Sequence, residues 1–595
     1  MSQNFAFPWR AAACCVALVV AGCITPATAE TPLILSHATA NEAADFDVYF
    51  PLRNKAELDK LVEAQTDRRS AQYHQWLKPA DFEARFGPTD DTIARVSAEM
   101  NSFGFQVTEH RGIRLHVTAS VTAVEAAFGV HINHARFAEG SEALVADGAL
   151  RLTPELVAAG AHIPQFSTVG PFHKHSQPAK VPTGLGPENI RPENYQSAYG
   201  PYLAADLRQA YGYPSYGAVN ASGVTIGILM SGGYNLPDIE EYLESWDGIP
   251  VADLGTLNTV LINGGAAYSS SNSGETHLDI EQSMGMAIGA SEILYNLSDL
   301  SNTVVLFGLN TIVSDNNVAI VNMSFGEPEE DYLPAYNGGI SQEYQVQIED
   351  ELFEQGSSQG ITFVASSGDH GSDPKGPAGT PYIAVEEPAS DPYVTGVGGT
   401  NLETTYTDGS DNSAYVSEFE RFDTEAVGVW ASGGGKSIFW AKPSYQSLVP
   451  TGQTVRTVPD VALHMGGCPS DATDSCEGIR SADVLIIGGA ESGEIGTSAS
   501  SPDIVGMFAL TAKLANGRLG PMNKYLYEAG AFQIAHPTAV LFRHKYISGT
   551  NYNYTIAAPY DMVIGLGTPY ATNFIDWLLG GSLPVSGVPG TATNP

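Results

Sequence analysis

The chain has 595 residues, of which 43% are hydrophobic and 16% charged, so it is a globular protein long enough for several domains rather than a disordered or fibrous one. Acidic residues outnumber basic residues by 66 to 28, and the formal net charge of −38 argues against nucleic-acid binding, because phosphate is held by basic patches. The same charge suits an exported protein that meets acid, where carboxylates become neutral, although ordinary solubility would also explain it.

Residues 1–29 have the form of a secretory signal peptide, with one arginine before an apolar run that is too short to span a bilayer. Two processing sites compete within this segment. Ala27-Thr28-Ala29 fits cleavage by signal peptidase, whereas Val20-Ala21-Gly22-Cys23 resembles a lipobox that would leave Cys23 lipid-anchored. Both sites predict export, and we favour full release into an extracellular or periplasmic space.

A small α+β domain is predicted for residues 30–165. Strand-like runs such as FDVYFPL and IRLHVTAS alternate there with helix-like runs such as KAELDKLVEAQ and VTAVEAAFGV, mainly within residues 45–136. Residues 166–195 are rich in Pro, Gly, Ser and Asn, which predicts an exposed linker that could hold a processing site.

Residues 196–580 have the pattern of an α/β domain. The short apolar runs VTIGILMS, AIVNMS, ITFVASSG and YVTGVGG alternate with helical segments, which predicts a doubly wound, mostly parallel sheet with helices on both faces. Functional groups are expected at the carboxyl ends of these strands. Residues 581–595 lack periodicity, and we expect a flexible tail.

Cys468 and Cys476 are the only cysteines beyond the signal region, and they enclose a short polar loop. In an exported chain this spacing favours a disulfide. A metal site is less favoured, because no second pair of cysteines supplies the other ligands.

Ser498 lies in GTSAS, a turn of small residues before an apolar helix, which is the form of a nucleophile turn. The helix would direct its positive N-terminus at the serine. Alone this signal is weak, since Gly, Ser and Thr are common in structural turns. The histidines beyond the linker do not stand in contexts typical of the base of a serine hydrolase; they are His277, His370, His464, His536 and His544.

Glu275 and Asp279, in GETHLD, are four residues apart on a predicted helix and therefore share one face. A solvated acidic stripe is one interpretation, but the apolar, glycine-rich flanks favour a buried pair. Two buried carboxyls cannot both ionise cheaply, so their proton affinities separate, as in an acid/base unit. Asp369 follows the strand ITFVASSG and could be a loop cap, a metal ligand or part of a reaction centre, with the loop cap as the default.

GETHLD, SSGD and GTSAS, in this order, resemble the sedolisin family of serine-carboxyl peptidases, close to its kumamolisin-like members. The blocks LKPADFEARFGPT, SDPYVTGVGGT, SGGGKSIFWAKPSYQ and RTVPDVAL extend the resemblance over nearly the whole mature chain. It implies a subtilisin-like peptidase domain behind a ferredoxin-like activation pro-domain. It also implies that Ser498 is the nucleophile, Glu275 the general base, Asp279 the carboxylate that orients it, and Asp369 a partner of the Ser498 N–H in the oxyanion hole.

The implied roles of Glu275 and Asp369 are chemically compatible with each other at acid pH. A histidine with a pKa near 6.5 is almost wholly protonated at about pH 4, whereas a glutamate near 4.3 still accepts protons. An aspartate serves an oxyanion hole only when it is protonated. The hypothesis is a secreted, acid-active endopeptidase made as an autoprocessing proenzyme, which the pro-domain inhibits and acid activates. The alternatives are a tripeptidyl exopeptidase and a catalytically inactive peptide-binding relative.

Nine of the 14 histidines precede Gln177, so acid would add positive charge mainly to the pro region. The resemblance further places Ser324, Phe325 and Gly326 on a strand that lines the peptide-binding cleft, where a substrate would add a strand. It also implies a calcium site. Asp561 matches one calcium ligand there, and Ile547 matches another position.

Tyr546 replaces the aspartate expected before Ile547 in the calcium site. Calcium prefers six to eight oxygens with several carboxylates, so the substitution favours a weakened or absent site, with Lys545 as a candidate to replace the charge of the cation. His370 is also unusual after the oxyanion aspartate, and its charge in acid would disfavour a protonated Asp369.

Overall fold

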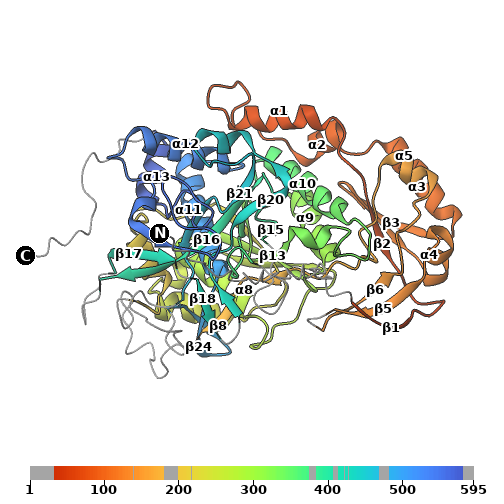
Figure 1. Ribbon diagram of the computed structural model, residues 1–595, viewed down its shortest axis with the longest axis horizontal. Helices are drawn as coiled ribbons and strands as arrows, with labels where there is room; N and C mark the ends of the chain where they lie inside the picture. Colours follow the sequence, from red (N-terminus) through yellow and green to blue (C-terminus); the bar gives the residue numbers. More distant parts are fainter. Residues whose placement is uncertain are drawn as a thin grey trace, which may run out of the picture.

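The computed structural model describes residues 32–137, 140–179, 199–215, 217–373, 383–405, 413–420, 422–425, 428–467 and 481–580. The signal segment with Cys23, the pair Cys468 and Cys476, and the expected tail at 581–595 lie outside the described residues. A smaller N-terminal unit lies at one end of a larger unit, and helices α1 (Lys55–Thr66) and α2 (Pro79–Phe86) of the smaller unit extend along the larger one (Figure 1). Within the described part, no helix is long and apolar enough to cross a membrane.

A nine-stranded sheet organises the larger unit, with the order β10-β11-β9-β12-β14-β16-β17-β25 and β22 paired to β16. Strands from β10 to β16 run parallel to their neighbours, as does β22, whereas β17 is antiparallel to β16. This confirms the mostly parallel sheet. The strands are β9 (Thr225–Met230), β10 (Leu257–Ile262), β11 (Ser291–Leu297), β12 (Ile320–Met323), β14 (Thr362–Ser366), β16 (Val394–Thr404), β17 (Tyr415–Glu420), β22 (Val461–His464) and β25 (Ile547–Gly549).

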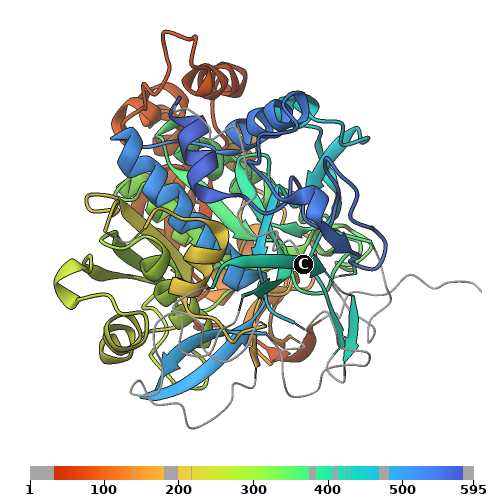
Figure 2. The ribbon, with the colours of Figure 1, turned by 90° about the vertical axis from the view of Figure 1, so that its left-hand side faces the viewer.

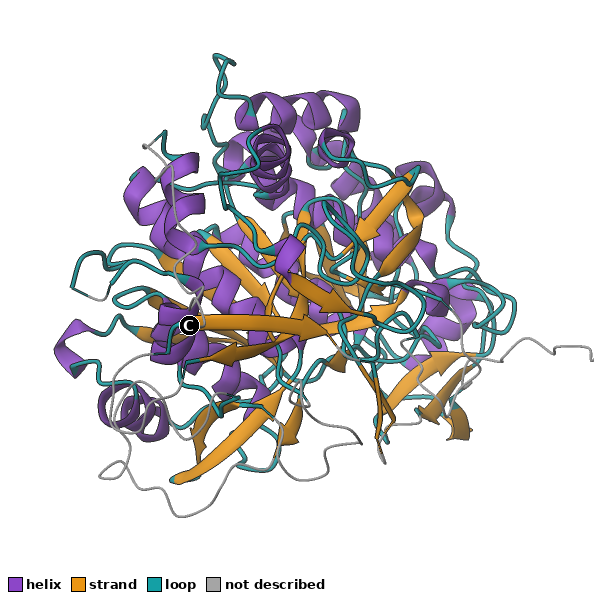
Figure 3. Ribbon diagram, turned by 60° about the vertical axis from the view of Figure 1, so that its left-hand side comes forward, coloured by secondary structure: helices purple, strands orange, loops and turns teal. Residues whose placement is uncertain are grey.

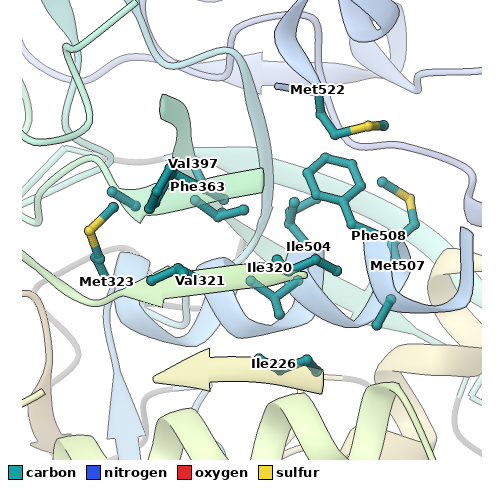
Figure 4. Packing of buried hydrophobic residues seen from close by; sticks show 14 of the residues in the cluster. Ile226, Ile320, Val321, Met323, Phe363, Val397, Ile504, Met507, Phe508 and Met522 are labelled. Carbon is teal, nitrogen blue, oxygen red and sulfur yellow. The ribbon is translucent and has the colours of Figure 1, made fainter. Parts of the chain in front are cut away.

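Two pairs of helices pack on this sheet, α8 (Gly274–Met286) with α11 (Thr497–Ala515), and α9 (Asn302–Asp315) with α10 (Glu343–Ser358). Figure 3 shows helices on either side of the strands. Apolar side chains of α11 pack directly onto β9, β12, β14 and β16 (Figure 4). The hydrophobic core around the sheet includes Ile226, Ile320, Val321, Phe363, Val397, Ile504, Met507 and Phe508. Because this burial is the main stabilising contribution, it fixes the N-terminal end of α11, where Ser498 lies.

The smaller unit is an α+β domain, as expected, with two three-stranded antiparallel sheets. The first is β2 (Phe46–Tyr49), β4 (Arg114–Thr118) and β3 (Gln106–Arg111), in the order that a ferredoxin-like domain requires. The next strand, β5 (Ile132–Arg136), belongs to the second sheet, where it lies between β1 (Leu33–His37) and β6 (Glu142–Ala146). Helices α3 (Asp90–Ser102), α4 (Val121–Phe128) and α5 (Pro154–Ala159) complete this unit.

The expected exposed linker at 166–195 is wrong for the part that the structure describes. The segments β7 (His173–Lys174) and β8 (Gln177–Ala179) add antiparallel strands to β13 (Phe325–Pro328) and β24 (Ala490–Ile495) of the larger unit. Pairing satisfies the backbone polar groups of the linker, so its residues can be buried despite their turn-prone composition. Residues 180–198 lie outside the described residues.

Trp76, in the loop after α1, is an aromatic contact between the two units. Its indole lies against Gly360 and Gly520, where an added Cβ would come within 2.7 Å and 2.4 Å of the ring. Lys55 of α1 adds a charged contact, because its Nζ lies 3.0 Å from Asp350 of α10. The lack of side chains at Gly360 and Gly520 therefore leaves room for the indole on the larger unit.

Replacing Trp76 with alanine should loosen the docked pro-domain by about 2 kcal/mol, the order expected for removing a partly buried aromatic ring. The measurement is hydrogen exchange of α1 and α2 in the full chain carrying Ser498→Ala. Phe103→Ala, which removes a ring 40% exposed within the same unit, is the control. Equal exchange in both variants would contradict a role of Trp76 in docking the pro-domain.

Candidate active site

Glu275 and Asp279 lie one turn apart on α8, and both side chains are buried, which confirms the helix and the buried pair. Asp279 Oδ1 accepts a hydrogen bond of 2.6 Å from Ser324 Oγ. Burial raises the pKa of Glu275, although hydroxyls of Ser176 and Ser498 oppose the change. Burial, together with the charge of Glu275, raises the pKa of Asp279 well above its usual range. Ionising both carboxyls is therefore unfavourable.

Ser498 lies in the first turn of α11, where helix N–H groups have no partner within the helix. Its N–H donates to the carbonyl oxygen of His175 at 3.1 Å, and its Oγ donates to the carbonyl of Ser324 at 3.4 Å. Gly496 makes this approach possible. Its φ is 145°, and a Cβ there would lie 2.0 Å from the His175 oxygen, so only glycine fits.

Asp369 follows β14, and its Oδ1 accepts hydrogen bonds from the N–H and the hydroxyl of Thr497 at 2.7 and 2.9 Å. A Cβ on Gly496 would come within 2.7 Å of Asp369 Oδ2, so this oxygen and the carbonyl of His175 face the same small space. Burial raises the pKa of Asp369 to about 8, against the opposing effects of His175 and Thr497. Asp369 is therefore a proton donor throughout the acid range.

A chain of buried hydrogen bonds extends from α11 to Asp279. Ser501 Oγ donates to Asn322 Oδ1 at 2.7 Å, Asn322 Nδ2 donates to Ser324 Oγ at 2.9 Å, and Ser324 donates to Asp279. Such a chain fixes the carboxyl in one orientation. The sequence analysis missed Asn322 and Ser501, although an asparagine within the apolar run AIVNMS was a usable signal.

The linker crosses the site as an extended strand. On one side, β7 pairs with β13, with Lys174 opposite Phe325 and His173 opposite Gly326. On the other side, β8 pairs with β24. The strand that carries Phe325 and Gly326 thus pairs with the protein's own linker as an added strand, and the cleft role of Ser324, Phe325 and Gly326 stays a prediction. The Phe325 ring is buried and contacts that of Phe172 at 5.2 Å.

His175 and Ser176 are the two linker residues that meet the carboxyl groups. The side chain of Ser176 donates a hydrogen bond to Glu275 Oε2. The imidazole of His175 is buried, with Nε2 2.6 Å from Glu386 Oε2 and Nδ1 2.7 Å from Ser366 Oγ. These two partners were not predicted from the sequence: Glu386 lies outside the three motifs, and within SSGD only Asp369, not Ser366, was given a role.

The histidines of the larger unit have other partners. His277 Nδ1 lies 2.9 Å from the carbonyl oxygen of Ile486, and His464 Nε2 lies 3.3 Å from Ser481 Oγ. Burial lowers the pKa of His370, against the opposing charge of Glu386, which weakens the concern that its charge disfavours a protonated Asp369.

Asp561, the expected calcium ligand, is held by hydrogen-bond donors. Its carboxylate accepts from the N–H groups of Ala557, Val563 and Ile564 at 2.9, 2.8 and 3.0 Å, and it lies 2.8 Å from Nε2 of His544. Ile547 begins β25. Calcium needs additional oxygen ligands in place of these donors, so the residues do not fit the ion.

Lys545 does not approach Asp561 as expected. Its Nζ lies over the Tyr546 ring at 4.8 Å from the centroid, and Tyr546 is half exposed. His544 occupies the place next to the carboxylate instead, because it begins the turn that leads into β25.

Comparison with known proteins agrees with this arrangement. Residues 34–159 match the pro-kumamolisin activation domain, and residues 259–526 match the subtilase family. Xanthomonalisin of Xanthomonas sp. (strain T-22) is 28% identical over 576 residues, which cover 89% of this chain and 65% of the relative. Sedolisin of Pseudomonas sp. (strain 101) is 28% identical over 577 residues, covering 92% and 89%.

A solved structure also shows the likeness to sedolisin. Pseudomonas sedolisin, a serine-carboxyl proteinase complexed with two molecules of pseudo-iodotyrostatin, has a TM-score of 0.53 and 28% identity, covering 64% of this chain and 98% of its own. Tripeptidyl-peptidase 1 of Rattus norvegicus is 25% identical over 315 residues, covering 50% of each chain.

The molecule is thus a subtilase-type peptidase with a subtilisin-like α/β catalytic domain and a separate pro-kumamolisin activation domain. Within that class, the chain is a homologue of sedolisin and xanthomonalisin, in line with its resemblance to the sedolisin family of serine peptidases.

The buried carboxyl groups predict that the folded chain is more stable in acid than at pH 8. A carboxyl group whose pKa is raised on folding contributes stability that is complete below its unfolded pKa and is lost as the pH rises through the folded value. For Asp369 this window extends from about 4 to about 8, and the loss is about 1.4 kcal/mol per pH unit.

Thermal unfolding of the Ser498→Ala chain should therefore show a melting temperature that falls between pH 4.5 and 8. Asp369→Asn in the same background should make the fall shallower, while Asp81→Asn, at an exposed position of the pro-domain, should leave it unchanged. Parallel curves for all three chains would count against a raised pKa at Asp369.

Proposed function

We propose that this protein is a secreted, acid-active serine-carboxyl endopeptidase, made as a proenzyme that cleaves its own linker. The single observation that carries the proposal is the position of one peptide bond, between His175 and Ser176. Its carbonyl oxygen accepts from the N–H of Ser498, and the next side chain contacts Glu275. A linker bound in this way occupies the site as a substrate would.

The proposed reaction uses four side chains. Ser498 Oγ attacks the carbonyl carbon of the bound peptide, and Glu275 takes the hydroxyl proton and later gives it to the leaving amine. Asp279 stabilises and orients Glu275. The N–H of Ser498 and the protonated carboxyl of Asp369 donate hydrogen bonds to the negative oxygen of the tetrahedral intermediate, and water then hydrolyses the acyl-enzyme.

The directions of the pKa changes support activity in acid. Glu275 must lose its proton to act as a base, and its raised pKa limits activity at the acid end. Asp369 must keep its proton, and a pKa of about 8 limits activity at the alkaline end. Asp369 therefore does not by itself demand strong acid, and its proton is lost only as the pH approaches 8.

The path of the linker favours an endopeptidase over the tripeptidyl alternative. If the bond after His175 is cleaved, Phe172 is the fourth residue before it, and this residue is buried against Phe325. The site thus accepts chain beyond a tripeptide on that side. Ser498, Glu275 and Asp369 also keep partners suited to catalysis, which disfavours an inactive peptide-binding relative.

Acid is proposed to release the pro-domain partly through two histidines at its contact with the larger unit. His162 stacks on Tyr344 at 5.0 Å, and His74 Nε2 lies 3.3 Å from the hydroxyl of Tyr525. Burial lowers the pKa of both histidines. Their contribution to docking is present when they are neutral, and it is lost as falling pH charges them. Export rests on the signal-like segment 1–29.

The test of the proposed function is a time course of the purified proprotein at about pH 4, beside a Ser498→Ala twin. We expect the wild type to shorten, gain activity on casein and yield a new N-terminus at Ser176, found by mass spectrometry, while the twin stays long and inert. If the wild type stays inactive even after an added protease trims the pro-domain, the peptide-binding alternative takes its place.

Substituting His162 by phenylalanine keeps the stacked ring but removes the charge. Activation should then require a lower pH, by a few tenths of a unit or more, because one source of acid repulsion is gone. The half-time of self-cleavage against pH is the measurement. His110→Gln, at an exposed histidine of the same domain, is the matched control, and an unshifted profile for His162→Phe would remove this histidine from the mechanism.

A further inference from the structure

The pocket around the His175 side chain is a second recognition element, separate from the groups that break the bond. The side chain is 4% exposed, and both ring nitrogens have polar partners, Glu386 and Ser366. A buried imidazole with two matched partners is costly to replace by an apolar side chain, because the partners then lose their hydrogen bonds.

The shape of the pocket depends on two glycines. A Cβ on Gly326 would lie 2.5 Å from Cε1 of the imidazole and 2.6 Å from Oε2 of Glu386. A Cβ on Gly368 would lie 2.7 Å from Oε1 of Glu386. The space between them and the carboxylate therefore suits a flat ring that presents an N–H at its far edge.

The charges in the pocket favour a cation. Three carboxyl groups act on His175, namely Glu386, Asp369 and Glu275, and their combined effect raises its pKa although burial lowers it. The pKa of Glu386 moves in the opposite direction: burial raises it, but the charge and hydrogen bond of His175, together with the charges of His370 and His173, outweigh burial. The nearby His370 repels the ring when charged, but its own pKa is lowered by burial.

We propose that Glu386, with Ser366, forms the specificity pocket for the residue that precedes the cleaved bond, and that this pocket selects histidine in its imidazolium form. The inference rests on the proposed peptidase function and adds its substrate class, peptides and proteins cleaved after histidine. Lysine and arginine rank second, because they supply the charge without the flat ring, and leucine ranks last.

The test uses hexapeptides Phe-His-Lys-X-Ser-Gln, copied from residues 172–177 with X as His, Arg, Lys or Leu. We expect kcat/KM of the mature enzyme at pH 4.5 to be at least about 10-fold higher for His than for Leu, the order of a lost buried charge pair. The His-to-Leu ratio should fall as the pH rises past about 6.5, where free imidazole loses its proton.

Glu386→Gln should reduce the His-to-Leu ratio about 10-fold or more, mainly through the His peptide. Glu386→Gln would also slow cleavage of the linker. It is therefore made together with His175→Leu, so that maturation no longer depends on the contact between His175 and Glu386. Glu387→Gln is the matched control, since this neighbouring buried glutamate accepts a hydrogen bond from Trp440 Nε1 at 2.7 Å and does not contact His175.

A His-to-Leu ratio near one in the wild type, or an equal ratio in the Glu386 and Glu387 variants, would overturn the pocket and leave the peptidase standing. If no hexapeptide and no casein is cut, even after the pro-domain is trimmed away, the proposed function fails together with the pocket.

Discussion

Desolvation of carboxyl groups around Ser498 is the constraint on which the site depends. Glu275, Asp279 and Asp369 lie in an interior where a negative charge is poorly solvated, so each of them holds its proton more tightly than in water. An unpaired buried carboxylate would cost several kcal/mol, and the hydroxyls of Ser324 and Thr497 offset only part of that cost. Protonation removes the remainder, so these groups favour the folded state below about pH 8, and over the same range Asp369 keeps the proton that the proposed catalysis needs.

The fold supplies this interior from three segments far apart in sequence. Helix α8 carries the carboxyl pair, the end of β14 leads to Asp369, and the first turn of α11 carries Ser498. The packing of α11 on the sheet fixes the third segment relative to the second. Turning the view of Figure 1 shows α11 running into the middle of the molecule, and most residues of this helix are buried (Figure 2).

Much of this was predictable from residue patterns, because local signals and the global fold agree. Apolar runs such as ITFVASSG predicted the parallel strands, and the spacing of Glu275 and Asp279 predicted one buried helix face. The buried path of the linker could not be predicted, because Pro, Gly and Ser are typical of exposed segments. Its burial is favourable only because β13 and β24 each offer an edge to which the linker backbone hydrogen-bonds. Glu386 was missed for a related reason, because its partner is a linker residue that no sequence spacing connects to it. His544 beside Asp561 likewise depends on the path of the turn into β25.

The pocket for His175 and the carboxyl of Asp369 have the same pH dependence. The imidazolium of His175 is stabilised by Glu386, and acid keeps that ring charged while it keeps Asp369 protonated. Neutral pH removes the charge from a free histidine side chain and restores the neutral form of His162 at the docking surface. With histidine before the cleaved bond, low pH both favours substrate recognition and loosens the pro-domain, so the pH controls the two together. An arginine there would bind through its charge at any of these pH values and would lose that coupling.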